Sequence, residues 1–338
     1  MDAIRTEGLT KVFRTPVKQE GLWGSVRSFF RRQYREHVAV AGISLRVEEG
    51  EFVGLLGENG AGKTTLVKLL AGLLYPTAGT ARVLGYIPWE RSNAFRRQFA
   101  LVMGQRSQLW WDLPAADSFL LNKALYGIPE EQFRRRRDEL AERLGIADRL
   151  HVQVRRLSLG ERMKCEILAA LLHAPRLLFL DEPTLGLDIV AQHSVREFLR
   201  EYNRTHGVTI VLTSHDMDDI EHLCSRVLVL STGRLVFDGS LEELSRRYAE
   251  EKLLRVEFAT PVDPTALAPF GHLREATPYR AVLSVPRTEV ASRAAALLNH
   301  FPVTDVTVQE LPVEEIVRRL FKQRDGFGGA SNSAAAVQ

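Results

Sequence analysis

Residues 57–65 read Gly57-Glu58-Asn59-Gly60-Ala61-Gly62-Lys63-Thr64-Thr65, and this stretch says most about the architecture. It fits the pattern G-x-x-x-x-G-K-[ST] and lies between the apolar run 52–56 and a helical pattern at 66–74. Glycines let the backbone wrap around phosphate oxygens, and the N-terminus of the following helix attracts the anion. Lys63 offers a charge to the β- and γ-phosphates, and Thr64 offers a hydroxyl to Mg²⁺. We therefore predict a phosphate-binding loop at the end of a buried strand.

Two acidic residues end a second apolar run, which reads Leu177-Leu178-Phe179-Leu180-Asp181-Glu182. A buried parallel strand brings its last residues to the edge of the sheet where ligands bind. Asp181 is predicted to hold Mg²⁺, directly or through water, and Glu182 to polarise the attacking water as a general base. The alternative is an acidic helix N-cap, which is disfavoured in a chain that also has the loop 57–65.

The order of the patterns predicts an α/β fold with a mainly parallel sheet, because strands alternate with helices. The strand patterns lie at 3–13, 43–47, 52–56, 177–180 and 209–212, and the helical ones at 66–74 and 115–145, the latter broken at Gly127–Pro129. We assign residues 1–245 to this first domain.

A smaller α+β domain is predicted for residues 246–325. Strand patterns lie at 255–259, 281–285 and 303–310, and helical patterns at 288–300 and 313–321. Residues 326–338 are rich in Gly, Ser, Ala and Asn, which predicts a disordered tail.

A basic insertion, residues 14–37, interrupts the first domain. From Leu22 onward apolar residues recur at helical spacing with arginines between them. We expect a basic amphipathic helix that binds an anionic membrane surface or a groove on a membrane partner. The alternative is a helix that packs on the protein's own sheet, and a nucleic-acid contact is disfavoured because no basic domain accompanies the arginines.

The composition sets limits on location and partners. The chain has 338 residues and a net charge of +3, which by itself does not indicate a nucleic-acid partner, and we expect none. No apolar run approaches the roughly 18–20 residues that cross a bilayer, and the first residues lack a signal-peptide pattern. We expect a cytosolic chain in which Cys165 and Cys224 are free thiols.

Three further segments separate this chain from other nucleotide-binding proteins. They are Leu157-Ser158-Leu159-Gly160-Glu161, Pro183-Thr184-Leu185-Gly186-Leu187-Asp188 and Thr213-Ser214-His215. With them, residues 1 to about 240 resemble the ABC ATPase family in order and spacing. The resemblance implies a P-loop ATPase core with an antiparallel edge sheet and a helical subdomain at about 92–165. In the family's signature segment, usually LSGGQ, Leu159 replaces a glycine and Glu161 a glutamine, whereas Ser158 and Gly160 remain.

The resemblance also implies roles for single residues. Gln105 would sense Mg²⁺ and the attacking water, His215 would contact the γ-phosphate, and Phe13 would stack on adenine. Two copies would pair head to tail, with ATP and Mg²⁺ between Lys63 of one copy and Ser158 and Gly160 of the other. Asp188 would close the loop that crosses between the copies. The implied partners are a second nucleotide-binding subunit and a transmembrane permease, so the chain would sit peripherally on the cytoplasmic face of the membrane.

The branch of the family and the competing functions depend on weaker signals. Residues 103–114 and 159–165, together with the basic insertion 14–37 and the C-terminal domain, resemble the branch that exports drugs, viologen-like cations and polysaccharides, and import remains open. Trp110 and Trp111 are predicted to belong to the permease dock, with burial in the core as the alternative. A soluble ABC ATPase acting on ribosomes or DNA is disfavoured because the chain has one phosphate-binding loop and no coiled coil. A GTPase is disfavoured because residues 122–125, Asn-Lys-Ala-Leu, lack the acid that reads guanine.

Overall fold

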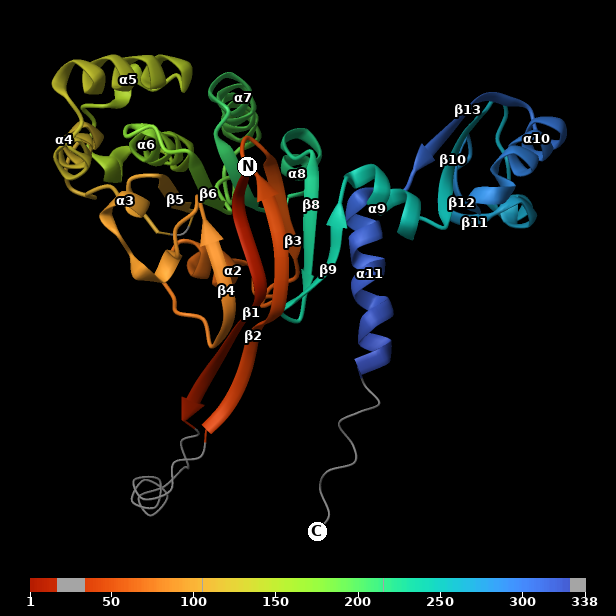
Figure 1. The fold of residues 1–338 in the computed structure, drawn as a ribbon. Coiled ribbons are helices and arrows are strands. Elements are labelled where there is room, and N and C mark those ends of the chain that lie inside the picture. The colour runs from red at the N-terminus through yellow and green to blue at the C-terminus, as the bar shows by residue number, and fades with distance from the viewer. Residues whose placement is uncertain (17–33, 105, 215, 329–338) are drawn as a thin grey trace, which may run out of the picture. The chain divides into compact units, whose positions relative to one another are not determined.

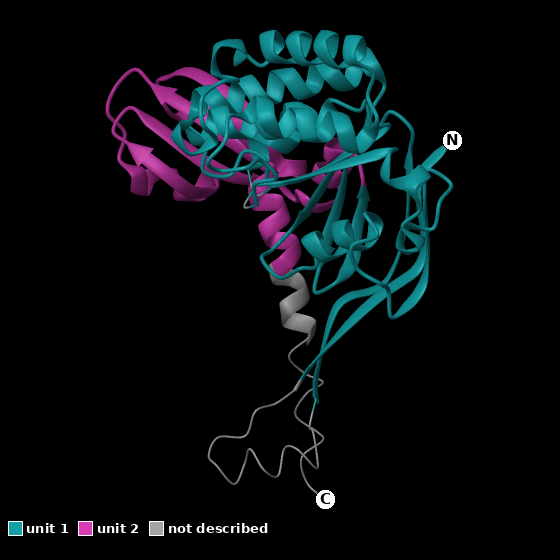
Figure 2. Ribbon diagram, turned by 90° about the vertical axis from the view of Figure 1, so that its left-hand side faces the viewer, with its two compact units in different colours: residues 1–238 teal, residues 239–338 magenta. Residues whose placement is uncertain are grey.

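The computed structural model describes residues 1–16, 34–104, 106–214 and 216–328. The chain divides into two compact units, residues 1–238 and 239–338 (Figure 2). The division falls after Asp238, a few residues before the boundary that we predicted at 245.

A six-stranded sheet forms the centre of the first unit, in the order β5-β6-β7-β3-β8-β9 (Figure 1). Its strands are β3 (Phe52–Gly57), β5 (Phe99–Met103), β6 (Leu177–Asp181), β7 (Thr209–Thr213), β8 (Arg226–Ser231) and β9 (Arg234–Gly239). The pairs from β5 to β8 are all parallel, which confirms the predicted sheet. Strands β6 and β7 are buried at every position, as expected of strands covered on both faces.

Helices pack around this sheet. They are α2 (Lys63–Leu70), α3 (Asn93–Arg96), α4 (Ala115–Tyr126), α5 (Glu130–Arg143), α6 (Leu159–Leu171), α7 (Ile189–His206) and α8 (Met217–Leu223), with single 3₁₀ turns η1 (Pro88–Glu90), η2 (Ala147–Arg149) and η3 (Val154–Arg156). Helices α4, α5 and α6 gather at the β5 end of the sheet (Figure 1). The predicted break at Gly127–Pro129 separates α4 from α5, because Gly127 ends α4 in the left-handed conformation.

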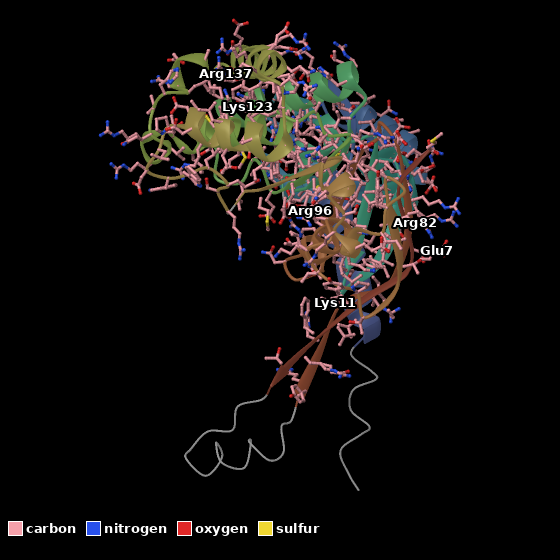
Figure 3. The ribbon with its side chains drawn as sticks, turned by 60° about the vertical axis from the view of Figure 1, so that its left-hand side comes forward. Glu7, Lys11, Arg82, Arg96, Lys123 and Arg137 are labelled. Atoms are coloured by element: carbon pink, nitrogen blue, oxygen red, sulfur yellow. The ribbon has the colours of Figure 1, made fainter. Side chains whose placement is uncertain are left out.

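The outer surface of the helical region is ion-paired, as its run of arginines indicates. Arg134 pairs with Glu130 one turn away, and Lys123 also bonds to Glu130. Lys123 and Arg137, both labelled in Figure 3, lie over the ring of Phe133 at 5.7 and 5.6 Å. Such exposed pairs contribute about 0–1 kcal/mol each to the stability of the fold. They therefore keep this surface polar and add little to stability.

A three-stranded antiparallel sheet, in the order β2-β1-β4, completes the first unit. Its strands are β1 (Asp2–Pro16), β2 (Tyr34–Glu48) and β4 (Ala78–Val83). Strand β4 pairs with β1 only as far as Thr10, whereas β1 and β2 stay paired out to Pro16 and Tyr34. Residues 12–16 and 34–38 thus form a two-stranded ribbon, here called the arm, which extends beyond the sheet from Lys11 (Figures 1 and 3).

The arm corrects part of the prediction for the insertion 14–37. Residues 14–16 and 34–37 are strand, and Arg35, which we placed in an amphipathic helix, pairs with Thr15 across the ribbon. An ion pair of 2.9 Å between Arg14 and Glu36 joins the two strands. The rest of the predicted helix, residues 17–33, lies outside the described residues.

The main core of the first unit lies between the antiparallel sheet, α2 and the parallel sheet. Apolar residues of β1, β2 and β4 pack with Leu66 and Leu69 of α2. The rings of Phe95, Phe99 and Phe179 form a chain with centroid distances of 4.7 and 6.1 Å. Burial of a leucine or phenylalanine side chain contributes about 1.5–3 kcal/mol to stability. These contacts therefore fix the position of α2 and of the loop 57–65 that precedes it. This helix begins at Lys63, earlier than the pattern at 66–74 predicted, and ends at Leu70.

The second unit is an antiparallel sheet with helices. The sheet has the order β11-β12-β10-β13, with β10 (Glu251–Phe258), β11 (His272–Thr277), β12 (Arg280–Pro286) and β13 (Val303–Glu310). The other elements are α9 (Leu241–Tyr248), η4 (Pro264–Phe270), η5 (Arg287–Glu289), α10 (Val290–His300) and α11 (Val313–Gly328). Leu254, Val256, Leu283 and Leu297 form its own core. Residues 326–328, which we predicted to be tail, belong to α11, and residues 329–338 lie outside the described residues.

Candidate active site

The loop 57–65 joins β3 to α2 in a conformation that needs glycine. Gly60 and Gly62 have φ values of 83° and 103°, which residues with a Cβ rarely adopt. A Cβ on Gly62 would lie 2.2 Å from the carbonyl oxygen of Ala39, and one on Gly57 would lie 2.6 Å from that of Leu230. The loop is therefore closely packed at its back, and its front is formed by backbone N–H groups at the start of α2.

Lys63 lies at the first position of α2 with its side chain folded into the loop. Its Nζ donates hydrogen bonds of 2.6 Å to the carbonyl oxygen of Gly57 and 3.2 Å to that of Glu58. Burial lowers the pKa of this amine, and the charges of Glu182, Asp181 and Glu58 oppose that shift. The loop thus contains a desolvated cation, whose charged form a bound phosphate would stabilise.

Asp181 at the end of β6 meets two hydroxyl groups. Thr213 Oγ1 donates to Asp181 Oδ1 at 2.6 Å, and Thr64 Oγ1 lies 3.2 and 3.1 Å from the two carboxylate oxygens. Asp181 and Thr213 are register partners on the parallel strands β6 and β7. A carboxylate beside a hydroxyl at the start of α2 is an oxygen-only donor set, which is the kind that Mg²⁺ prefers. Thr64 and Asp181 therefore fit the predicted metal role.

Glu182 follows in a strained turn. Its φ of 56° is left-handed, and its N–H donates to Thr213 O at 3.0 Å and to Thr213 Oγ1 at 3.1 Å. The loop after β5 lies directly against it, because a Cβ on Gly104 would be 2.2 Å from the carbonyl oxygen of Glu182. A cavity of about 290 Å³ adjoins this turn and is lined by Glu182, Thr184, Leu185, Gly186, Gln192, Ser214 and Asp216. There is thus room for small molecules beside Glu182.

The segment 157–161 starts α6, and Ser158 is its N-cap. Ser158 Oγ accepts from the N–H of Glu161 at 3.1 Å, and the carboxylate of Glu161 accepts from the N–H of Ser158 at 2.8 Å. This reciprocal capping box explains in physical terms why glutamate is suited to position 161. Gly160 is required for close packing, because a Cβ there would lie 2.7 Å from that of Ala191.

Asp188 caps the next helix, α7. Its Oδ1 accepts from the N–H of Ala191 at 2.8 Å. The segments 157–161 and 183–188 touch, since a Cβ on Gly186 would lie 3.3 Å from Leu159. The apolar side chains of Leu159, Leu185, Ile189 and Val190 are exposed here, the last two by 83% and 79%.

The predicted site residues therefore form two groups. The loop 57–65 lies with Asp181 and Glu182, whose charges act on Lys63, and Ser158 and Gly160 lie with Asp188 at the starts of α6 and α7. Phe13 lies half-buried on the arm, with Lys11 Nζ 5.2 Å from its ring centroid, and so is not a core residue. Gln105 and His215 lie outside the described residues.

Thr213 also belongs to this site, although we named it only as part of the segment 213–215 and predicted no role for it. The signal was its place at the end of a buried strand, where a parallel neighbour of β6 must bring it beside Asp181. A polar residue at the end of an apolar strand that neighbours the strand with the acidic pair can therefore be predicted to belong to the site.

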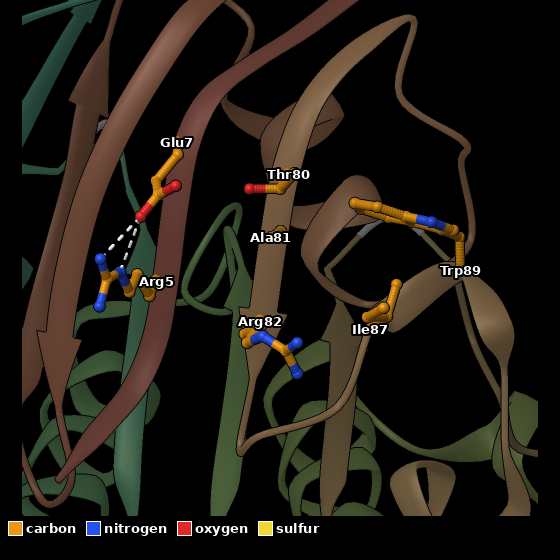
Figure 4. Close-up of a pocket in the computed structure, with 7 residues that line it drawn as sticks. All are labelled: Arg5, Glu7, Thr80, Ala81, Arg82, Ile87 and Trp89. Atoms are coloured by element: carbon orange, nitrogen blue, oxygen red, sulfur yellow. Dashed lines mark hydrogen bonds and ion pairs between the residues drawn. The ribbon is translucent and has the colours of Figure 1, made fainter.

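A second hollow, shown in Figure 4, lies on the antiparallel sheet. It is lined by Arg5, Glu7, Thr80, Ala81, Arg82, Ile87 and Trp89. Arg5 Nη2 is paired with Glu7 at 2.7 Å, and Arg82 donates to the carbonyl oxygen of Gly85 at 3.2 Å. Because both arginines have partners within the protein and none of the predicted ATP-binding residues lines this hollow, we do not assign nucleotide binding to it.

A phosphate-binding loop between β3 and α2 and an acidic pair at the end of β6, both at the edge of one parallel sheet, define a P-loop ATPase. The family model "ABC transporter" matches residues 40–185, and "EvrA-like ABC transporter, C-terminal domain" matches residues 250–309. The chain belongs to the family of ABC transporter ATP-binding proteins, and it is an ATP-hydrolysing subunit.

Two relatives and one solved structure illustrate the similarity. The chain is 34% identical to the ABC transporter ATP-binding protein NatA of Bacillus subtilis over 215 residues, which is 64% of this chain and 87% of NatA. It is 31% identical to the daunorubicin/doxorubicin resistance ATP-binding protein DrrA of Streptomyces peucetius over 347 residues, which is 93% of this chain and 98% of DrrA. A solved ATP-binding subunit of an ABC transporter superposes with a TM-score of 0.60 at 27% identity, covering 73% of this chain and 93% of that one. Among the described residues, no helix is long and apolar enough to cross a membrane.

Proposed function

We propose that this chain powers an exporter at the cytoplasmic face of a membrane, where two nucleotide-binding subunits close around ATP beneath a permease. The observation that supports the ATPase site most directly is the meeting of Asp181 with Thr64, next to Glu182 and the buried Lys63. Support for export comes from the relatives whose matches extend over most of this chain. The relatives named for daunorubicin/doxorubicin and linearmycin resistance match 93% and 86% of it, whereas a Nod factor export protein and a methionine import protein each match 63%.

In the proposed mechanism, the loop 57–65 and Lys63 hold the β- and γ-phosphates. Thr64, Asp181 and Gln105 would hold Mg²⁺, which when bound supplies charge neutralisation for the phosphates. Glu182 accepts a proton from water as the water oxygen attacks the γ-phosphorus and the bond to the β-phosphate oxygen breaks. His215 contacts the γ-phosphate, and Phe13 stacks on adenine.

Closure by a second copy would complete the site. Ser158 Oγ accepts from the N–H of Glu161, and its hydroxyl hydrogen would be donated to a phosphate of the opposite copy. The exposed Ile189 and Val190 after Asp188 are suited to a surface that becomes buried. ATP would thus join the two copies, and hydrolysis would release them.

The decisive experiment is Glu182→Gln, which keeps the shape of the side chain and removes the base. We expect ATP binding to persist and kcat to fall by about 10²–10³, with an ATP-bound dimer accumulating. The matched control is Glu197→Gln on the exposed side of α7, which should keep the wild-type rate. Wild-type hydrolysis by Glu182→Gln would show that this glutamate is not the base.

A mixing experiment tests the composite site. Lys63→Ala should abolish ATP binding, whereas Ser158→Asp keeps the helix cap, binds ATP as a monomer and repels the phosphate of the other copy. Neither variant alone should dimerise on ATP. A mixture should dimerise, because one of its two sites joins an intact Lys63 to an intact Ser158, and failure of the mixture would contradict head-to-tail pairing.

A further inference from the structure

Asp219 of α8 is a completely buried carboxylate with three side-chain donors. Thr184 Oγ1 lies 2.5 Å from its Oδ2, Ser214 Oγ lies 2.6 Å from the same oxygen, and Arg196 Nε lies 2.5 Å from Oδ1. The exposed fraction of Asp219 is 0%. An ion buried to this extent is costly unless all its hydrogen-bonding capacity is used, and here both oxygens are engaged.

The three donors come from three different parts of the active site. Thr184 stands two residues after Glu182, and Ser214 is the residue before His215. Arg196 is on α7, the helix that Asp188 caps. Thr184 and Ser214 both line the cavity beside Glu182, so the network lies directly behind the place where hydrolysis is proposed to occur.

A second layer of bonds makes the network rigid. Arg196 Nη2 bonds to Asp216 Oδ2 at 2.7 Å, and the N–H of Asp216 donates to Ser214 Oγ at 3.0 Å. The side chain of Arg196 is only 12% exposed. Ser214 therefore donates to Asp219 and accepts from Asp216, which fixes residues 214 and 216 relative to α8.

We infer that Asp219 is a positioning residue for ATP hydrolysis. Its hydrogen bonds to Thr184 and Ser214 hold the turn after Glu182 and the end of the segment before His215 at a fixed distance from each other. Its hydrogen bond to Arg196 connects both to α7. Movement of α7 at the dimer surface would thus reach Glu182 through a few short hydrogen bonds. This role rests on the proposed function of Glu182 and His215, and it adds a connection between the catalytic turn and the helix that bears the crossing loop.

The test uses an isosteric pair at position 184. Thr184→Val removes the hydroxyl that bonds to Asp219 and keeps the shape, whereas Thr184→Ser restores the hydroxyl. We expect Thr184→Val to lower kcat by about 10-fold or more, as for the loss of one hydrogen bond to a charged group. The dissociation constant for ATP should stay within about 2-fold, because the phosphate-binding loop is untouched, and Thr184→Ser should recover most of kcat.

The matched control is Thr209→Val. Thr209 is also buried, but it lies at the start of β7, at the other end of that strand from Thr213, and its hydroxyl oxygen accepts from the N–H of Gly50 at 2.9 Å. If buried threonine hydroxyls act on stability alone, both valine variants will lower the melting temperature and neither will change kcat, and the inference is wrong. A loss of kcat confined to Thr184→Val supports it.

Glu182→Gln measured in parallel separates this inference from the proposed function. If Glu182→Gln hydrolyses ATP normally, the assignment of the base fails. A wild-type kcat for Thr184→Val together with an inactive Glu182→Gln would overturn only the role of Asp219.

Discussion

The hydroxyl of Thr213 donates a 2.6 Å hydrogen bond to Oδ1 of Asp181, from the neighbouring position on the parallel strand β7. The same threonine oxygen accepts from the N–H of Glu182 at 3.1 Å. One side chain therefore sets the direction of the predicted metal ligand and of the backbone that bears the predicted base.

Thr213→Val should weaken the use of Mg²⁺. Without the hydroxyl, the carboxylate of Asp181 loses its shortest partner and is free to rotate away from Thr64. We expect the Mg²⁺ concentration for half-maximal ATPase activity to rise by about 10-fold, the scale of a hydrogen bond to a charged group. Thr213→Ser is the control and should remain near wild type. An unchanged Mg²⁺ requirement in the valine variant would contradict the role of Thr213.

Trp110→Ala should uncouple the subunit from its permease. Trp110 and Trp111 are 49% and 48% exposed, so neither is a core residue. Trp111 is already covered on one face by Arg162, whose guanidinium lies 4.2 Å from its ring centroid. Exposed aromatic side chains are frequent interface anchors. We expect basal ATPase activity of the isolated subunit to persist and binding to the permease to fall by at least about 10-fold.

The control for this prediction is Tyr279→Ala, which removes an aromatic side chain of similar exposure from the second unit. Equal permease binding by Trp110→Ala and wild type would exclude the dock, and so would equal losses in both variants.

Glu166→Gln should not destabilise the protein at neutral pH. Glu166 Oε1 accepts from Ser107 Oγ at 2.5 Å and from the N–H groups of Gln108 and Leu109, while its buried Oε2 has no hydrogen-bond partner among the described residues. Burial raises the pKa of this carboxyl, and the hydrogen bonds from Ser107, Gln108 and Leu109 oppose the shift. The folded state then binds the proton more tightly than the unfolded state, so this contribution to stability is fully present below the unfolded pKa of 4.5 and is lost as pH rises from there through the raised pKa of the folded state.

Urea unfolding at pH 4.5 and 7.5 measures this effect. The stability of Glu166→Gln relative to wild type should be higher at pH 7.5 than at pH 4.5. Glu166→Ala removes the carboxylate oxygen that accepts from Ser107, Gln108 and Leu109, and it should cost about 1–3 kcal/mol at both pH values. A glutamine variant that loses as much stability as alanine at pH 7.5 would contradict the prediction.

His173 should make the protein sensitive to mild acid. Its ring stacks on Tyr126 at 3.9 Å, and its Nε2 lies 3.1 Å from the carbonyl oxygen of Phe99. Burial lowers the pKa of His173 to about 4, against 6.5 for the free side chain. The unfolded chain is then protonated first, so stability is lost as pH falls from 6.5 towards 4, by up to about 3 kcal/mol.

His173→Gln should remove most of this loss, because glutamine does not titrate in that range. His222→Gln at the exposed end of α8 is the control and should retain it. If the slopes of unfolding free energy against pH are the same for His173→Gln and wild type between pH 6.5 and 4, the prediction is wrong.

The parts of the site that sequence predicted are those whose chemistry is local. The loop 57–65 and the pair Asp181 and Glu182 were readable because each is a short run next to a buried strand. The network around Asp219 was not, because three acids lie between residues 216 and 219 and only tertiary packing decides which one is buried. The strand β11 was missed because residues 272–277, His-Leu-Arg-Glu-Ala-Thr, do not alternate, and cross-strand pairing with β12 overrides the weak pattern.

The arm shows a different limit. Helical spacing from Leu22 onward predicted a helix through Arg35, yet residues 34–37 continue β2. Pairing with β1 decides the conformation at those residues, and single-chain periodicity contains no information about a partner strand. The prediction for residues 17–33 lies outside the described residues and stays a prediction.

The left-handed backbone at Glu182 has a consequence for how this protein would evolve in the laboratory. A residue with a Cβ at a φ of 56° is less stable there than glycine by about 1–2 kcal/mol. A library selected only for resistance to heat would therefore tend to enrich glycine at position 182, and the survivors would be robust but inactive. Thermostability and turnover thus oppose each other at this one residue, and any screen for a more durable form of the enzyme needs a selection for ATP hydrolysis alongside it.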